Sequence, residues 1–307
     1  MHQRLHLQPG TLWPALVRQT EHALRCGALC PIETVQEAIE DGGVRFLVRS
    51  VPSLASKERV RKERQDKAAG GGAGSNPFLP YDPDLFVADV SNTHIALLNK
   101  FNVIDGHLLI ITRRFEQQEA LLDLADFEAL AACMAEFEGL GFYNGGTVAG
   151  ASQPHKHLQI VPLPLADQGP PVPIEPLLAS VRAEGPIDIL PGLPFLHGFV
   201  RLDPALANRP QLAAQNAFER YGALLDAFGL RGVEVDGEVR QSAPYNLLLR
   251  RQWMLLVPRS VEFVDGISVN ALGFAGSLFV RNEEQMRLIR AFGPITVLRR
   301  AAIATSK

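Results

Sequence analysis

Two pairs of apolar segments, each joined by a short turn, most constrain the fold of this chain. The segments are HIALLNKFNV (94–103) with GHLLIIT (106–112), and PYNLLLRR (244–251) with WMLLVPRS (253–260). In the first pair, the Asp105-Gly106 dipeptide is a strong signal for a tight turn. Strands joined by short turns pair in antiparallel fashion, so both pairs predict hairpins.

Helical patterns separate these strands. Apolar residues recur at helical spacing over 10–30, 116–138 and 209–229, whereas VRFLVRSV (44–51) alternates like a strand. Hairpins with helices between them predict an α+β fold, in which helices pack on a mostly antiparallel sheet.

The two hairpins also resemble each other, which predicts a duplicated unit; chance similarity is the alternative. Each has a polar-headed strand, a turn and an apolar strand that ends near an arginine. We therefore expect a catalytic half over 1–165 and a degenerate half over 166–307, packed into one globule.

Composition excludes several classes of protein. The 30 basic and 33 acidic residues give a net charge of −3, which disfavours general nucleic-acid binding but leaves room for a local basic pocket.

Three cysteines are too few for a disulfide framework, and we expect Cys26 and Cys30 to pack on one helix face, since their spacing is poor for a zinc knuckle. The N-terminal residues lack a secretion-signal pattern and there is no run of 18 apolar residues, so we expect a soluble, cytoplasmic protein without membrane contact.

Residues 57–83 differ sharply in composition from their surroundings. A basic stretch begins at Lys57, a glycine-rich tract follows at 70–74, and prolines come next. Such a segment is typical of a flexible solvated loop. Alternatively, its first residues close over a polyphosphate as a lid.

The segment SQPHKHLQIVPLP (152–164) contains the strongest candidates for functional side chains. On a strand, His155, His157 and Gln159 project from one face because side chains alternate, and Lys156 points to the other face. Three aligned polar side chains on one face, followed by apolar residues, predict the edge of a pocket.

Three interpretations of the two histidines are open. A metal site needs a third ligand, which His94 or His107 could supply from a neighbouring strand. The histidines could also be hydrogen-bonded residues without a functional role. In the third interpretation, one neutral imidazole attacks phosphorus while its other nitrogen keeps a proton, held by an acceptor such as a backbone carbonyl. Upstream, NGGTVAGAS (144–152) offers backbone N–H groups that can approach a phosphate closely.

The segment NGG…ASQPHKHLQI, with LLNKF and GHLLIITRRF upstream and PYNLLL…WMLLVPRS downstream, resembles the histidine-triad superfamily in its nucleotidyltransferase branch. Within that branch it is most similar to the fungal-type diadenosine tetraphosphate phosphorylases, also called ATP adenylyltransferases. The resemblance implies that His157 is the nucleophile, that His155 supports it, and that Gln159 binds the α-phosphate. Gln159 stands where the hydrolase branch has a third histidine, which favours transfer over hydrolysis.

The resemblance also implies a set of substrate-binding residues. They are Lys57, Asn99, Lys100, Asn144, Gly150, Ala151, Ser152, Gln153, Asn246 and Arg259. Lys57 lies in the variable loop, and the last two come from the C-terminal half. No resident metal is implied, although Mg²⁺ could accompany the nucleotide.

The implied reaction is a reversible phosphorolysis of diadenosine tetraphosphate. His157 takes AMP from the substrate and expels ATP, and inorganic phosphate then releases ADP. The partners would be diadenosine polyphosphates, ATP, ADP and phosphate, with the protein a monomer or weak homodimer. The alternatives are a hexose-1-phosphate uridylyltransferase, a nucleotide-binding sensor without turnover, and a metal enzyme on a cupin-like barrel.

Overall fold

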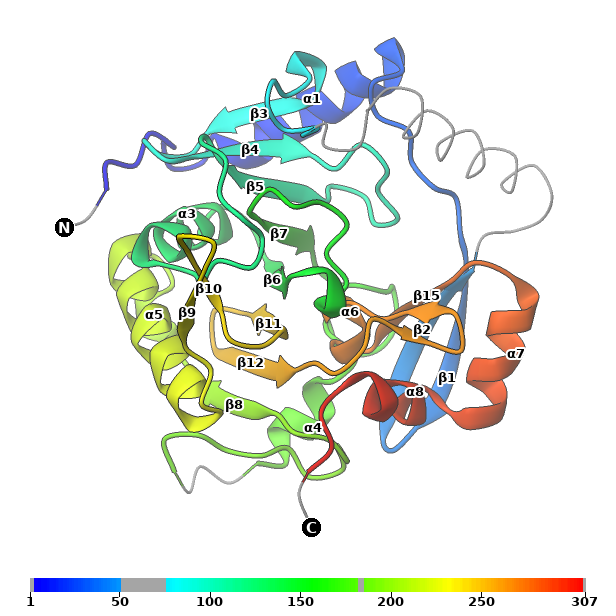
Figure 1. The fold of residues 1–307 in the computed structure, drawn as a ribbon. Helices are drawn as coiled ribbons and strands as arrows, with labels where there is room; N and C mark the ends of the chain where they lie inside the picture. Colours follow the sequence, from blue (N-terminus) through cyan, green and yellow to red (C-terminus); the bar gives the residue numbers. More distant parts are fainter. Residues whose placement is uncertain (1–2, 51–75, 182–184, 306–307) are drawn as a thin grey trace.

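A central eight-stranded sheet organises the protein (Figure 1). The computed structural model describes residues 3–50, 76–181 and 185–305. In the sheet, the strand order is β3-β4-β5-β7-β6-β11-β12-β8, and every neighbouring pair is antiparallel. The strands are β3 (Phe86–Asp89), β4 (His94–Leu98), β5 (Leu108–Thr112), β6 (Gly139–Gly145), β7 (His157–Pro162), β8 (Gly198–Arg201), β11 (Tyr245–Leu249) and β12 (Trp253–Pro258).

Helices and smaller sheets surround this sheet. The helices are α1 (Leu12–Cys26), α3 (Leu124–Met134), α4 (Glu175–Ala179), α5 (Pro210–Ala227), α6 (Ala271–Phe274), α7 (Glu283–Phe292) and α8 (Pro294–Ala301), with 3-10 turns η1 (Pro83–Leu85), η2 (Thr147–Ala149) and η3 (Pro204–Leu206). The small sheets are β1 (Val35–Asp41) with β2 (Val44–Ser50) and β15 (Ser277–Val280), β9 (Gly232–Val235) with β10 (Glu238–Gln241), and β13 (Phe263–Val264) with β14 (Ile267–Ser268).

Both faces of the large sheet are buried. Along β11, Leu247 and Leu249 join a core with α1, α3 and α5, whereas Leu248 joins a second core with β2, β15 and α6–α8. Figure 1 shows α3 and α5 side by side on the left, and α7 and α8 with β1, β2 and β15 on the right. Burial on both faces explains why the central strands read as continuous apolar runs.

The predicted α+β class and both predicted hairpins are confirmed. Strand β4 pairs with β5, and β11 pairs with β12, in the antiparallel orientation that the hairpin prediction implies. Strand β6 pairs directly with β11, so the two predicted halves share one sheet. The boundary between 165 and 166, and the duplication, stay predictions.

Two local predictions are wrong. The helix expected over 116–138 begins only at Leu124, because the Asp123 side chain accepts the N–H of Asp126 in a capping box. Cys26 and Cys30 do not share a helix face, because α1 ends at Cys26 and Gly27 adopts a left-handed conformation with φ 79°.

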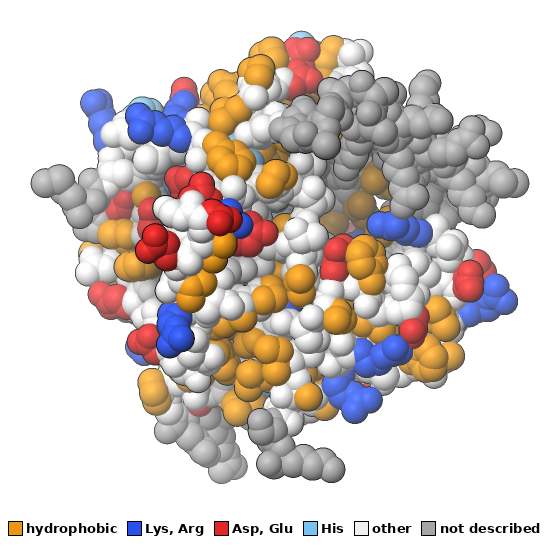
Figure 2. Space-filling model, viewed as in Figure 1, with side chains coloured by type: hydrophobic (Ala, Val, Ile, Leu, Met, Phe, Trp, Pro, Cys, Tyr) orange, Lys and Arg blue, Asp and Glu red, His pale blue; other side chains and the backbone are white. Residues whose placement is uncertain are grey.

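The face of the molecule shown in Figure 2 carries side chains of mixed character. In Figure 2, acidic and basic side chains are interspersed with apolar and uncharged ones, in keeping with the net charge of −3. No helix in the described ranges combines the length and apolar character needed to cross a bilayer. Lys57 and most of the predicted basic and glycine-rich loop lie outside the described residues.

Candidate active site

A cavity of about 930 Å³ opens beside β7. Its size is at the upper end of the range for small-molecule sites, enough for a ligand larger than a single nucleotide. It is lined by His157 and Gln159 from β7, by the segment around Asn99 after β4, and by residues of β15 from the three-stranded sheet. The cavity therefore lies between the large sheet and the smaller one.

His157 is held in one tautomer. It lies at the start of β7, is 4% exposed, and its Nδ1 is 2.8 Å from the backbone oxygen of His155. A carbonyl only accepts, so Nδ1 carries the proton and the lone pair of Nε2 is free. Burial lowers the pKa of His157 to about 4, outweighing the hydrogen bond to the His155 carbonyl. The imidazole is thus a neutral nucleophile at neutral pH.

Both ring nitrogens of His155 are already occupied. Its Nε2 lies 2.8 Å from the carbonyl oxygen of Thr112 and donates to it. Its Nδ1 then accepts from the Asn76 amide nitrogen at 2.9 Å, and the orientation of that amide is fixed because its oxygen accepts the N–H of Phe78. His155 therefore supports His157 through its backbone carbonyl and has no free lone pair of its own.

Gln118 fastens the histidine segment to its surroundings. Its side-chain oxygen accepts the N–H of His157 at 2.9 Å, and its amide nitrogen donates to the carbonyls of Asn144 and His157. The adjacent backbone also pairs with the segment, since Gln117 forms a bridge with His155. These contacts hold 116–118 in a bridge and turn rather than in a helix.

A directional chain of hydrogen bonds ends at Gln159. The N–H of Phe101 donates to Asn99 Oδ1, which leaves Asn99 Nδ2 to donate to His107 Nδ1 at 3.1 Å. His107 Nε2 must then carry the proton, and it donates to Gln159 Oε1 at 3.0 Å. The amide nitrogen of Gln159 is left as the donor available to a ligand in the cavity. Burial lowers the pKa of His107 to about 4, so this relay stays neutral.

Lys156 lies on the opposite face of the segment, as predicted. It is 1% exposed, and its Nζ is 2.6 Å from Oδ2 of Asp126, in the first turn of α3. Asp126 also contacts His94 Nε2 at 3.0 Å. Burial opposes the charge on Lys156, yet the pKa of Lys156 is raised because Asp126 and Glu116 are nearby. The ion pair anchors the back of the segment and does not face the cavity.

The glycine-rich segment after β6 is braced from behind. Asn144 Oδ1 accepts from Asn246 Nδ2 at 2.9 Å and from the N–H of Ala271 at 2.9 Å. Arg259, 2% exposed, donates to Asn246 and to the carbonyls of Ala149 and Val269. Gly150 has φ 92° and an added Cβ would lie 2.8 Å from Asn270, so only glycine fits there.

The structure gathers most of the predicted residues at the cavity. Those lining it are His157, Gln159, Asn99, Lys100, Asn144, Gly150, Ser152 and Gln153. His155, Ala151, Asn246 and Arg259 are not among its lining residues. Because the donors of Arg259 and Asn246 are directed to protein oxygens, the structure gives these two a bracing position rather than the predicted contact with a ligand.

Sequence reasoning missed several residues of the site. Phe78 places its ring edge against both histidines, with centroids 5.6 Å from His155 and 5.5 Å from His157. His107 was considered only as a third metal ligand, although its place two residues after a turn signal put it on the neighbouring strand. Gln118 belongs to no motif and carried no signal.

Two buried neutral histidines predict a loss of stability in acid. In the unfolded chain both have a pKa near 6.5, whereas His107 and His157 have a pKa of about 4 in the fold. Between these values the unfolded state binds more protons, so stability falls as pH drops from 6.5 towards 4. We expect a loss of roughly 2 kcal/mol per histidine by pH 5, measured by urea unfolding at pH 7, 6 and 5. A His107→Gln variant should lose less of its free energy of unfolding between pH 7 and pH 5. An unchanged dependence of stability on pH would contradict the lowered pKa of His107.

Family models match nearly the whole chain. Residues 2–180 match the model described as the Ap4A phosphorylase N-terminal domain, and residues 191–304 match the ATP adenylyltransferase C-terminal domain. The chain belongs to the Ap4A phosphorylase family. The resemblance drawn from HKHLQI and its flanking segments is thereby confirmed.

Curated relatives agree with this family. This chain is 26% identical over 268 residues to diadenosine 5',5'''-P1,P4-tetraphosphate phosphorylase 2 of Saccharomyces cerevisiae (strain ATCC 204508 / S288c). The alignment covers 79% of this chain and 78% of that protein. The chain is 28% identical over 274 residues to Protein APA1 of the same organism, covering 82% and 80%.

Solved structures share the fold of this Ap4A phosphorylase family member. The crystal structure of yeast Ap4A phosphorylase Apa2 matches with a TM-score of 0.76 at 21% identity, over 98% of this chain and 96% of that chain. Apa2 in complex with Ap4A matches with a TM-score of 0.75 at 20% identity, over 98% and 100%. At these identities the match establishes the architecture.

Proposed function

We propose that this protein is a nucleotidyltransferase that carries out the reversible phosphorolysis of diadenosine tetraphosphate to ATP and ADP. The observation that carries the proposal is the free Nε2 of His157, which faces a cavity of about 930 Å³ while its Nδ1 is held by the His155 carbonyl. Membership of the Ap4A phosphorylase family, and the relative named as a tetraphosphate phosphorylase, support the choice of substrate.

In the first step, His157 Nε2 attacks the α-phosphorus of one adenosine half. The Nε2–P bond forms, the bond from that phosphorus to the bridging oxygen breaks, and ATP leaves. The ring becomes positively charged, and the carbonyl oxygen of His155, 2.8 Å from Nδ1, stabilises that charge. The amide nitrogen of Gln159 is placed to donate to the negative oxygens that develop on phosphorus.

In the second step, an oxygen of inorganic phosphate attacks the same phosphorus. The phosphate–adenylyl bond forms, the P–Nε2 bond breaks, and ADP leaves while the ring returns to its neutral form. Each step exchanges one activated bond to phosphorus for another, which makes the reaction reversible. Lys100 lines the cavity and would supply positive charge, together with Lys57 from outside the described residues.

The cavity offers few protein ligands for a Mg²⁺ ion that accompanies the nucleotide. Asp82 is the carboxylate among the described residues that line the cavity, so protein carboxylates would contribute little. The phosphates of the nucleotide would therefore hold the ion, as is usual for Mg²⁺. The ion would neutralise phosphate charge. A cytoplasmic location and a monomeric or weakly dimeric state are further parts of this proposal.

Product chromatography tests the reaction. Diadenosine tetraphosphate incubated with the protein should yield ATP and ADP only when inorganic phosphate is present. ATP with AMP in the absence of phosphate would identify a hydrolase instead. Exchange of hexose-1-phosphate with a uridine diphosphate sugar, without turnover of the adenine substrate, would favour the uridylyltransferase alternative, and binding without products would favour a sensor.

The relay that ends at Gln159 makes a testable prediction. In an Asn99→Asp variant, the carboxylate accepts from His107 Nδ1, so His107 Nε2 loses its proton and Gln159 rotates to present its oxygen to the phosphate. We expect adenylyl transfer to slow by roughly 10²-fold in single-turnover experiments, the usual cost of one lost oxyanion donor.

The matched control is Asn99→Ala, which should lose much less because His107 Nε2 can keep its proton. Simple charge repulsion by the new carboxylate would act on substrate binding and would weaken at high salt. A loss confined to KM that disappears in high salt would contradict the relay.

A further inference from the structure

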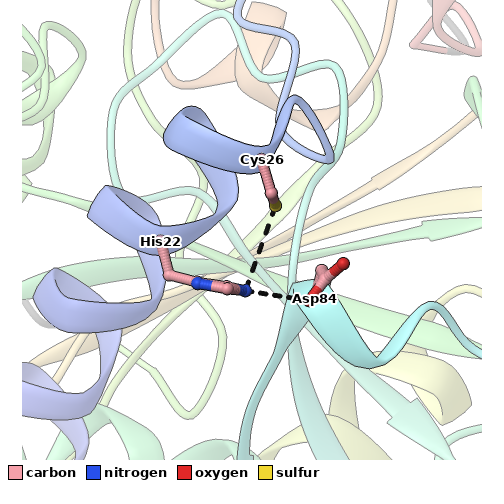
Figure 3. A group of neighbouring side chains, drawn as sticks. All are labelled: His22, Cys26 and Asp84. Carbon is pink, nitrogen blue, oxygen red and sulfur yellow. Dashed lines mark hydrogen bonds and ion pairs between the residues drawn. The ribbon is translucent and has the colours of Figure 1, made fainter.

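Three metal-ligating side chains gather on the outside of the fold, beside a segment whose neighbouring residues Asp82 and Leu85 line the cavity. His22 and Cys26 lie on α1, and Asp84 lies in η1 (Figure 3). None of the three is among the lining residues of the cavity. The proposed reaction uses none of them.

The spacing on α1 directs two of these groups to one place. Residues four apart lie one above the other on a helix, so His22 and Cys26 share a face. His22 Nε2 is 2.8 Å from Asp84 Oδ1 and 3.9 Å from Cys26 Sγ. All three ligand atoms lie within 4.8 Å of one another. Figure 3 shows the three side chains converging on the space between α1 and η1.

The backbone around the cluster is already fixed. Gln19, one turn before His22 on the same helix, donates its amide to the Asp84 carbonyl at 2.6 Å. Asp82 caps η1 by accepting the N–H of Asp84 at 3.0 Å. Gln19, His22 and Cys26 thus form one stripe of α1 that faces η1, and a ligand would meet positions held in advance.

The donor set selects the ion. A thiolate, an imidazole and one carboxylate suit Zn²⁺, whereas Mg²⁺ and Ca²⁺ take oxygen ligands. In a tetrahedral zinc site with usual bond lengths, neighbouring donors are about 3.4–3.6 Å apart. The His22–Asp84 separation of 2.8 Å would open slightly, and the His22–Cys26 separation of 3.9 Å would close slightly. Both changes are within the reach of side-chain rotation.

We propose that His22, Cys26 and Asp84 form a zinc site with water as the fourth ligand. Binding replaces the thiol proton of Cys26, which is released, and His22 binds through Nε2 while its proton moves to Nδ1. With neutral histidine, thiolate and carboxylate, the two negative charges balance the ion. The side chains of His22 and Asp84 are 46% and 49% exposed, so zinc and its water can enter directly from solvent.

The location gives the ion a structural role. Asp84 precedes β3, and the stretch before it carries Asn76 and Phe78, which contact the two active-site histidines. A zinc bridge would fasten this stretch to α1. Because binding stabilises only the folded state, a hundredfold excess over Kd should raise Tm by roughly 5 °C.

Metal titration tests the site without relying on turnover. Chelator-treated protein, free of nucleotide, is titrated with Zn²⁺ in competition with a chromophoric chelator, and Co²⁺ is used as an optical probe. We expect one equivalent to bind and a thiolate-to-cobalt charge-transfer band to appear. Cys26→Ser should abolish that band and weaken zinc binding at least tenfold, and Asp84→Asn should weaken it less.

Matched variants identify the ligands. Cys30→Ser should behave like the wild type, because Cys30 Sγ contacts the Gly27 carbonyl at 3.5 Å beyond the end of α1. His157→Ala, which removes an imidazole from the cavity, should also leave the titration unchanged. Loss of binding in either of these variants, or retention of the cobalt band in Cys26→Ser, would overturn the proposal. Binding weaker than about 10⁻⁴ M in the wild type would do the same.

Discussion

Replacing His157 by glycine should abolish phosphorolysis, with a loss of roughly 10⁴-fold or more in kcat, because the proposed mechanism forms its bond to phosphorus through the His157 imidazole. The wild type, stopped early in the reaction without phosphate, should carry one acid-labile AMP per chain, and the variant should carry none. Added imidazole should restore part of the activity in the glycine variant, since it can occupy the vacated space and attack in place of the side chain.

His155→Asn is the matched control for this prediction. The backbone carbonyl of residue 155, which accepts from His157 Nδ1, remains in place in this variant. The loss in kcat should therefore be at least tenfold smaller than in His157→Gly. Urea unfolding midpoints should be compared for both variants. A wild-type chain that stays unmodified after incubation with the substrate in the absence of phosphate would contradict the covalent mechanism.

The second large effect is expected in stability. Asp126→Ala should lower the free energy of unfolding by about 3–5 kcal/mol, because it removes the buried counter-ion of the Lys156 ammonium and leaves only the half-exposed Glu116. Asp126 also receives hydrogen bonds from His94 Nε2 and from the N–H of Asp123, which adds to the cost. Urea denaturation at pH 7 measures the change.

Glu116→Ala provides the control, since Glu116 contacts the same ammonium at 3.1 Å but is 44% exposed. Its removal should cost less than about 1 kcal/mol. Adding Lys156→Met to Asp126→Ala should recover part of the stability by removing the orphaned charge. Equal losses of unfolding free energy in Asp126→Ala and Glu116→Ala would show that burial of the carboxylate does not determine how much its ion pair with Lys156 stabilises the fold.

Much of the fold was predictable because its signals are local. Strands β4 and β5, and β11 and β12, are close in sequence and joined by recognisable turns. The three-stranded sheet was missed because β2 pairs in parallel with β15, more than 200 residues later in the chain. The sequence of β1, VQEAIED, shows no clear alternation of apolar and polar residues.

The site was predictable where side-chain alternation determines it. The pattern placed His157 and Gln159 on one face and Lys156 on the other, and chemistry predicted an acceptor, such as a backbone carbonyl, for one ring nitrogen of the attacking histidine. The bracing positions of Asn246 and Arg259 could not be foreseen, because both donate to the carbonyl of Ala149, which is far away in sequence. A polar residue in a family motif can bind protein oxygens as readily as a ligand.

The position of β7 between β5 and β6, near the middle of the eight-stranded sheet, has a consequence for local unfolding. Edge strands open by small fluctuations, but β7 is released only when ladders on both sides break. Amide hydrogen exchange should therefore be slowest along β7 and much faster in β3 and β8. The nitrogen that we propose attacks phosphorus is thus attached to one of the segments expected to lose its structure last.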